Sequence, residues 1–284
     1  MVFGAAFLDE GAAFSADAGD PGMVSLWDLR GRRSSRTFRA PGSVRFLEVA
    51  DPGRLVVAGL LPQSGGRFWY VSVIDAATGR ELRRIEEMQL PATSISGIAA
   101  MPGGRVLVSY DDRGVPETSC LWSLDSGQLV RRYRRAADAV TSDRRWGLQG
   151  RTIWEIDAER VKARHPVSGM AWGVAIAPGG LRAVSQGSGS AFLWNGSGTI
   201  RTFGDQRGWL WSGAFTPDGR LLITGSDSQF VLRDGLSGES IADLDGHEGK
   251  LRSVATSPSG RHALSGDSLG SVLLWQLPAP AGSA

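Results

Sequence analysis

The feature that most limits how this chain can fold is a repeated unit of about 40 residues. Residues 205–225 align without a gap to residues 246–266, and residues 166–186 and 90–110 align in the same register. Weaker copies begin near Ser43 and near Val2, and the weakest copy covers residues 139–154. Each copy contains short apolar runs separated by turns rich in Gly, Pro, Asp and Ser. This pattern predicts a series of small β-sheets that stack on one another.

A second pattern counts the copies independently. The third short run of each copy is centred on one position, which is Trp in five of the copies: Trp27, Ile74, Trp122, Trp154, Trp194, Arg233 and Trp275. Successive positions lie 47, 48, 32, 40, 39 and 42 residues apart. A turn and a fourth short run follow most of them. We therefore predict seven four-stranded units, because a single sheet of this size is marginally stable in water.

Composition narrows the classes of protein that the chain can represent. The 284 residues include 39 glycines, which fits many tight turns. Lys and Arg number 31 against 29 Asp and Glu, so bulk charge gives no reason to expect a nucleic-acid or membrane partner. The single cysteine, Cys120, excludes an internal disulfide and favours a reducing compartment. The sequence lacks an apolar run of roughly 18 residues and a signal-peptide pattern, so we expect a cytoplasmic protein.

The last unit carries a recognisable set of residues: Gly246-His247, then Ser257-Pro258-Ser259-Gly260, then Trp275. With the 40-residue period, this set resembles the WD-repeat family. The resemblance implies an all-β, seven-bladed β-propeller of four-stranded antiparallel blades around a central channel. We expect one propeller domain over residues 1–277, followed by a Pro/Ala/Gly-rich tail at 278–284.

The resemblance also implies a hydrogen-bonded chain of His, Ser or Thr, Asp and Trp across the strands of a blade. The last unit keeps His247, Ser265 and Trp275, but Leu269 occupies the Asp position six residues before the Trp, and Asp267 lies two residues earlier. We therefore expect this unit to have lost its turn aspartate.

The other units depart further from the family's pattern. The sixth unit keeps Thr224 and Asp227, yet Gln206 replaces the His and Arg233 replaces the Trp. The remaining tryptophans that we assign to the structural repeat motif are Trp27, Trp122, Trp154 and Trp194.

The two ends of the pattern predict an irregular seventh blade. The first unit opens at Val2 on its innermost strand, and the last unit ends at Gln276 on its third strand. Either the seventh blade is three-stranded, or the natural protein begins upstream of Met1 and supplies the missing strand. The sequence leaves both interpretations open.

The sequence offers little for catalysis or metal binding. Its three histidines are His165, His247 and His262, and His247 is explained by the repeat motif. No Cys/His cluster or Ca²⁺-loop spacing is present. The aspartates between the second and third runs are typical of turns. We expect no catalytic residues, no metal and no cofactor.

Arginine pairs fall on or beside the predicted outermost strands, for example Arg32-Arg33, Arg83-Arg84 and Arg131-Arg132. They form a basic rim for an acidic partner or for phosphates. Alternatively, their charges only prevent the outer strands from pairing edge to edge with another sheet.

Large aromatics gather at one level of the repeat. In the alignment, one column contains Trp209, Lys250 and Met170. The column two residues later contains Trp211, Arg252 and Trp172. Both columns lie at the start of the innermost strand, where propellers of the family present side chains around the channel mouth. Aromatics with arginine are typical of interaction hot spots. The alternative is that these tryptophans only pack between blades.

We therefore expect a non-catalytic protein–protein interaction scaffold. It would bind a partner at the channel mouth through Trp172, Trp209, Trp211, Lys250 and Arg252. The partners are expected to be other proteins of unknown identity, and the propeller is expected to be monomeric. The alternatives are a propeller enzyme, a hydrolase or lyase with its site in the central channel, and a regulatory module of a larger protein.

Overall fold

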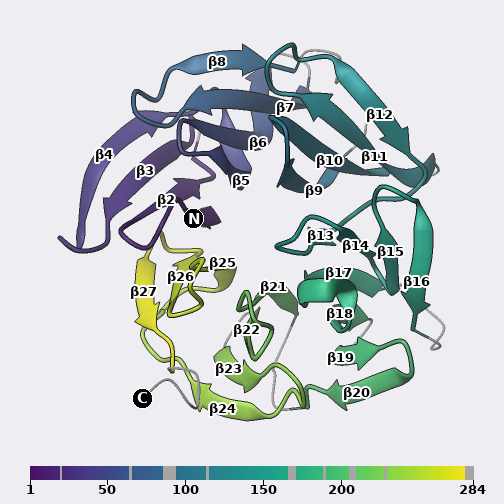
Figure 1. Ribbon diagram of the computed structural model, residues 1–284. Helices are drawn as coiled ribbons and strands as arrows, with labels where there is room; N and C mark the ends of the chain where they lie inside the picture. Colours follow the sequence, from purple (N-terminus) through teal and green to yellow (C-terminus); the bar gives the residue numbers. More distant parts are fainter. Residues whose placement is uncertain are drawn as a thin grey trace.

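Seven antiparallel sheets surround a central channel in the computed structural model, as Figure 1 shows. The described residues are 1–19, 21–63, 66–85, 94–112, 115–165, 171–187, 190–204, 209–226 and 229–278. Over these ranges the only helical element is the short 3-10 turn η1 (Pro178–Gly180). No helix in the described part of the chain is long and apolar enough to cross a membrane. The prediction of an all-β, seven-bladed propeller is confirmed.

Six blades have four strands, and their order along the chain is their order from the channel to the rim. The first blade contains β1 (Val2–Phe7), β2 (Ala12–Asp17), β3 (Met23–Asp28) and β4 (Arg33–Arg39). The second contains β5 (Ser43–Asp51), β6 (Arg54–Gln63), β7 (Gly66–Asp75) and β8 (Glu81–Arg84). The third contains β9 (Ser94–Met101), β10 (Arg105–Asp112), β11 (Val115–Ser123) and β12 (Leu129–Tyr133).

The remaining blades follow the same plan around the ring. The fourth contains β13 (Ala139–Val140), β14 (Trp146–Gln149), β15 (Thr152–Glu155) and β16 (Arg160–Arg164). The fifth contains β17 (Ala171–Ile176), β18 (Ala183–Gly187), β19 (Ala191–Asn195) and β20 (Gly198–Thr202). The sixth contains β21 (Leu210–Phe215), β22 (Leu221–Ser226), β23 (Phe230–Asp234) and β24 (Ser240–Asp243). The seventh contains β25 (Leu251–Thr256), β26 (His262–Asp267) and β27 (Val272–Gln276).

The tight turn after the innermost strand explains why the repeat keeps Asp or Ser beside Gly. In the sixth blade the Asp218 carboxylate accepts hydrogen bonds from the Thr216 hydroxyl at 2.6 Å and from the Arg220 amide at 3.1 Å. Gly219 and its seventh-blade counterpart Gly260 adopt φ angles of 71° and 69°, which favour a residue without a Cβ. The side-chain cap and the glycine therefore reverse the chain between two buried strands.

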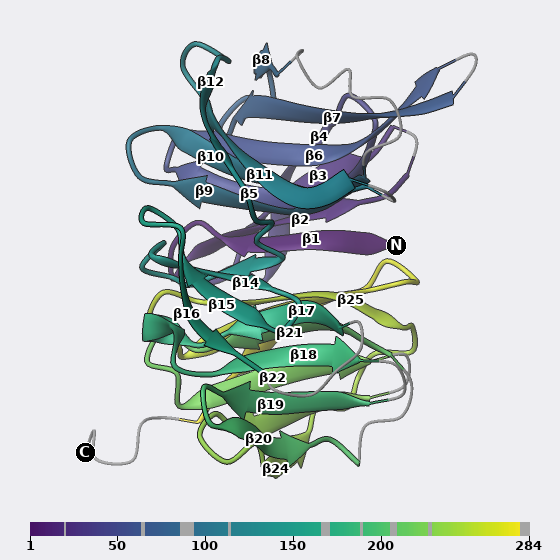
Figure 2. The ribbon, with the colours of Figure 1, turned by 90° about the vertical axis from the view of Figure 1, so that its right-hand side faces the viewer.

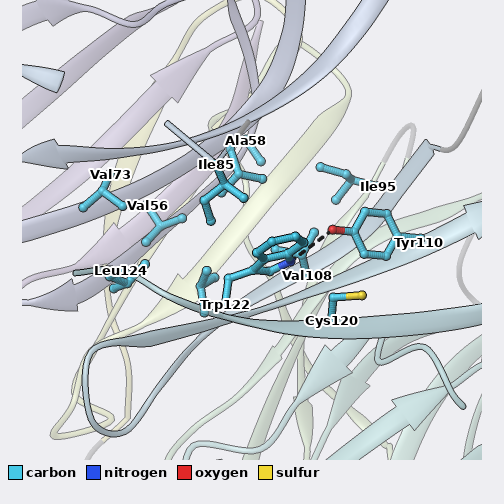
Figure 3. Packing of buried hydrophobic residues seen from close by; sticks show 12 residues of the cluster. Val56, Ala58, Val73, Ile85, Ile95, Val108, Tyr110, Cys120, Trp122 and Leu124 are labelled. Carbon is cyan, nitrogen blue, oxygen red and sulfur yellow. Dashed lines mark hydrogen bonds between the residues drawn. The ribbon is translucent and has the colours of Figure 1, made fainter. Parts of the chain in front are cut away.

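The core lies between blades, because each sheet has two apolar faces that its neighbours cover. Figure 3 shows the junction of the second and third blades, where Val56 and Val73 face Val108 and Trp122. The Trp122 indole donates a hydrogen bond to the Tyr110 hydroxyl at 3.3 Å. Figure 2 shows from the side how neighbouring blades stack face to face around the ring. The ring thus buries strands that are apolar on both faces.

The seventh blade is three-stranded among the described residues, with β27 at its outer edge. The chain thus agrees with a three-stranded blade, while a fourth strand supplied from upstream of Met1 stays a prediction. The ring closes where β25 and β26 pack against β1, and the Ser253 hydroxyl donates to the Val2 carbonyl at 3.4 Å. Glu10 of the first blade accepts a hydrogen bond from the Ser259 amide at 2.7 Å and lies 3.5 Å from His262. These contacts join the last blade to the first near the channel.

Candidate functional site

Three tryptophans form a continuous stack on the surface. Trp172 lies in β17, Trp209 directly precedes β21, and Trp211 lies in β21. The Trp172 and Trp209 ring centroids are 5.5 Å apart, and those of Trp209 and Trp211 are 6.3 Å apart. Their exposed fractions are 48%, 42% and 50%. Core tryptophans such as Trp154 are fully buried, so these three are not explained by packing between blades alone.

The stack continues onto charged side chains. The Arg252 guanidinium lies 4.9 Å from the Trp211 ring centroid and 5.8 Å from that of Phe3. The Arg45 guanidinium lies 4.4 Å from the Phe3 ring centroid. The stacked residues therefore follow the innermost strands of five consecutive blades, from the fifth through the seventh to the first and second. We call this set the aromatic–arginine arc: Trp172, Trp209, Trp211, Arg252, Phe3 and Arg45.

Four members of the arc lie at the same irregularity in the pairing of the strands. The pairing between the first and second strands skips one residue in each of four blades, and the skipped residues are Phe3, Arg45, Trp211 and Arg252. A β-bulge leaves one residue out of the ladder and changes the direction of its side chain. Sequence reasoning missed Phe3 and Arg45, although both occupy the arginine and tryptophan column of the repeat.

The arc borders a cavity at the channel mouth. The cavity has a volume of about 700 Å³, and Phe3, Arg45, Trp69, Trp211 and Arg252 are among its lining residues. A second cavity of about 520 Å³ is lined by the ends of the innermost strands, such as Phe7 and Thr256, whereas the first is lined by their starts, so the two occupy the two ends of the channel. The buried Nε atom of Arg252 has no hydrogen-bond partner in the described ranges of the chain. The mouth thus combines exposed rings with an unused donor.

The ionisable groups inside the channel already make structural contacts, one of them between two blades. Arg144 of the fourth blade reaches the Glu48 carboxylate of the second at 3.4 Å. Burial raises the pKa of Glu48, and the Arg144 charge offsets part of that rise. Asp138 accepts a hydrogen bond from the Gly150 amide at 2.8 Å. These groups already have structural partners, and no histidine lines either cavity.

The three histidines lie away from the channel. His165 is buried with its Nε2 atom 2.8 Å from the Thr199 hydroxyl and its ring against Trp194. His262 lies at the ring closure beside Glu10. The described residues contain no group of three His, Cys, Asp or Glu side chains suited to a metal ion.

Lys250 lies just before β25 and is exposed, and its backbone exchanges hydrogen bonds with Ser268 at 2.9 and 2.8 Å. Its column partner Met170 lies outside the described residues, as do Gln206 and Asp227.

The seventh blade contains a complete hydrogen-bond network around His247. The His247 Nε2 atom is 2.6 Å from the Ser265 hydroxyl, and the Trp275 indole donates to the same hydroxyl at 2.7 Å. The His247 Nδ1 atom is 2.9 Å from the carboxylate of Asp267. Asp267 is fully buried and also accepts hydrogen bonds from the amides of Leu269, Gly270 and Ser271, each at 2.9 Å.

The expectation that this blade has lost its turn aspartate is therefore wrong. Asp267 fills that role from two residues earlier in the chain, because the following turn is longer and wraps around its carboxylate. Counting back from the Trp gave Leu269, whose side chain is exposed.

Comparison with known proteins agrees with this network. The family model "WD domain, G-beta repeat" matches residues 197–234 and 238–276. The chain is also similar to transcription initiation factor TFIID subunit 5 of Caenorhabditis elegans, with 23% identity over 251 residues. That alignment covers 85% of this chain and 36% of the relative, so the chain spans about a third of the relative's length.

The chain is a seven-bladed β-propeller whose last two repeats match the WD-repeat model. Its sixth repeat shows how the motif can change without losing the blade. Arg233 stands at the Trp position and is 1% exposed, its Nε donates to the Thr224 hydroxyl at 3.0 Å, and its guanidinium lies 4.2 Å from the Phe203 ring centroid. The arginine therefore keeps the hydrogen bond to the second strand that tryptophan makes in other blades.

The other motif tryptophans also donate hydrogen bonds, two of them to a serine of the second strand and one to a backbone carbonyl. Trp27 and Trp194 donate to Ser15 and Ser185 at 2.8 and 3.0 Å. Trp154 donates to the Ala136 carbonyl at 3.0 Å.

Proposed function

We propose that this WD-repeat propeller is a non-catalytic protein-interaction scaffold whose partner binds at the channel mouth. The partner-binding residues would be those expected from the sequence, Trp172, Trp209, Trp211, Lys250 and Arg252, extended by Phe3 and Arg45. The aromatic–arginine arc is the observation that carries this proposal. Tryptophan and arginine are the side chains that most often dominate binding energy at protein interfaces.

The geometry of the blades supports rigid presentation of the arc. Four of its side chains project from bulges within regular strands, so a partner would bind with little loss of loop entropy. The unpartnered Nε–H of Arg252 would donate a hydrogen bond to a carbonyl or carboxylate of the partner. Similarity to a protein named as a subunit of a transcription initiation factor favours a role in an assembly. The alternative of a channel enzyme gains no support from the paired groups in the channel.

The test is quantitative capture of partners from an extract of the source organism, with the purified propeller as bait. We expect the double variant Trp209→Ala/Trp211→Ala to reduce recovery of the captured partner at least tenfold, on the order of a hot-spot loss. The matched control is Leu236→Ala/Ile241→Ala, which removes two exposed apolar side chains from the rim of the same blade. Circular dichroism checks that both variants fold. Equal recovery with the tryptophan variant and the control would overturn the proposal.

A further inference from the structure

The junction between the seventh and first blades lacks a contact that the other six junctions share. In each four-stranded blade, a large or apolar side chain at the end of the outermost strand packs toward the Trp position of the next blade. We call these side chains plugs: Phe38, Ile85, Tyr133, His165, Phe203 and Leu244. Tyr133, for example, lies 5.9 Å from Trp154 between ring centroids, and Ile85 shares a cluster with Trp122 (Figure 3).

Trp27 of the first blade has no plug from the described residues of the seventh. In its place is a cavity of about 390 Å³, lined by Trp27, Leu264, Leu274 and other residues of both blades. Leu274 is 40% exposed, whereas its counterparts Leu121, Ile153 and Leu193 are at most 5% exposed. The cavity therefore lies where the fourth strand of this blade would place its plug.

The outer edge of β27 carries the matching backbone groups. In the six complete blades, the outermost strand pairs with the third strand through the same register shift, next to the Trp position. β27 has no neighbour on this side among the described residues, and Figure 1 shows it at the rim beside β3 and β4. An open edge of this kind can accept an extended segment as an additional strand.

The charges beside the cavity specify what such a strand would carry. Two residues before the plug, Arg131 reaches Glu159 of the next blade at 3.1 Å, and Arg201 reaches Glu239 at 2.8 Å. In the first blade, the residues at the positions of Glu159 and Glu239 are Arg32 and Arg33. Arg32 and Glu159 share the same unusual backbone conformation, with φ angles of 50° and 51°. Arg32 thus carries the opposite charge to Glu159, its counterpart at the junction of the third and fourth blades.

We propose that the open edge of β27 binds an extended segment of a partner protein as a fourth antiparallel strand. The segment would carry an acidic residue, then any residue, then a large apolar residue. The acidic residue would lie opposite Leu274 and pair with Arg32, because Leu121 and Arg131 are opposite each other in the third blade. The apolar residue would lie opposite Val272 and fill the cavity over Trp27. This surface is separate from the channel mouth.

The test uses short synthetic peptides labelled with a fluorophore and measures binding by fluorescence anisotropy. The three probes share one extended sequence and differ at its centre: Asp-Thr-Phe, Arg-Thr-Phe and Asp-Thr-Ala. We expect the Asp-Thr-Phe peptide to bind at least about fivefold more tightly than either of the others. Hydrogen exchange of the bound protein should slow at the amides of β27.

The decisive variant is Arg32→Glu, an exposed charge change that should leave folding intact. It should reverse the preference, so that the Arg-Thr-Phe peptide binds more tightly than the Asp-Thr-Phe peptide. Trp209→Ala/Trp211→Ala should leave peptide binding unchanged, which separates this proposal from the channel-mouth proposal. Absence of binding, an order of affinity that Arg32→Glu does not change, or β27-mediated dimers seen by sedimentation would each overturn the inference.

Discussion

The fourth and seventh blades show that a well-preserved repeat sequence does not go together with complete burial of the blade. The fourth has the weakest repeat sequence, and its innermost strand β13 contains only two residues. Even so, Leu148, Ile153 and Trp154 are fully buried in it. The seventh has the best-preserved motif and a complete network around His247, yet Leu274 on its outer strand is 40% exposed.

The difference shows that two kinds of interaction hold a blade. The motif network acts within a blade and links its strands through buried hydrogen bonds. Burial depends on the neighbours, because the plug of the preceding blade and the outermost strand cover the apolar faces. The fourth blade relies on Tyr133 and on its neighbours, whereas the seventh relies on the internal network around Asp267.

Removing the centre of that network should have the largest effect. Asp267→Ala removes the buried acceptor of His247 and of three backbone amides, so we expect a loss of about 3–5 kcal/mol in the free energy of unfolding. Urea unfolding followed by fluorescence measures it. Asp125→Ala is the control, since Asp125 is 76% exposed in its pair with Arg54 and should matter by less than about 1 kcal/mol. Similar losses for the two variants would show that the network contributes little.

A smaller change in stability should distinguish the junction of the third and fourth blades from the open junction of the seventh and first. Trp154→Leu removes a fully buried ring that packs against Tyr133, and we expect it to cost about 3 kcal/mol. Trp27→Leu removes a half-buried ring beside an existing cavity, and we expect about 1 kcal/mol. Both tryptophans donate one hydrogen bond, so the comparison isolates packing. Equal losses in urea unfolding would mean that the seventh-to-first junction is packed as well as the others.

The sequence predicted the architecture because every blade repeats the same turns and the same Trp position. It also predicted that Trp172, Trp209, Trp211 and Arg252 lie at one level of the ring, since they share columns of the repeat. The approach of Trp172 to Trp209 depends on neighbouring blades, and no periodicity encodes it.

Two features escaped the sequence analysis for different reasons. Asp267 was missed because the turn after β26 is longer than the family's turn, and a fixed spacing cannot follow a change in loop length. Phe3 and Arg45 were missed because they belong to the weaker first and second copies of the repeat, whose innermost strands were not aligned with the column of Trp211 and Arg252. The longer turn after β26 depends on backbone geometry that residue types specify only weakly.

The smallest of the three predicted effects depends on pH. It is tested on one carboxylate of the seventh blade and one of the fourth. Burial alone would raise the pKa of Asp267, but hydrogen bonds from His247 and from backbone amides outweigh it and lower the pKa below its usual value of 3.8. In the fourth blade, hydrogen bonds from Arg145 lower the pKa of Glu155, while both of its arginine partners remain exposed. A lowered pKa stabilises the fold above the unfolded-state value, and that stability is lost as the pH falls through the folded-state value.

Unfolding midpoints measured from neutral pH down to about pH 3 should therefore separate the two groups. Asp267→Asn should flatten the decline in stability below pH 4, because its amide does not titrate. Glu155→Gln should leave the decline nearly as steep as in the unmodified protein, since solvent screens a pair whose arginines are exposed. Added salt should weaken the contribution of Glu155 and leave that of Asp267 unchanged, because Asp267 is inaccessible to counterions. The same acid response in both variants would place the acid sensitivity outside the seventh-blade network.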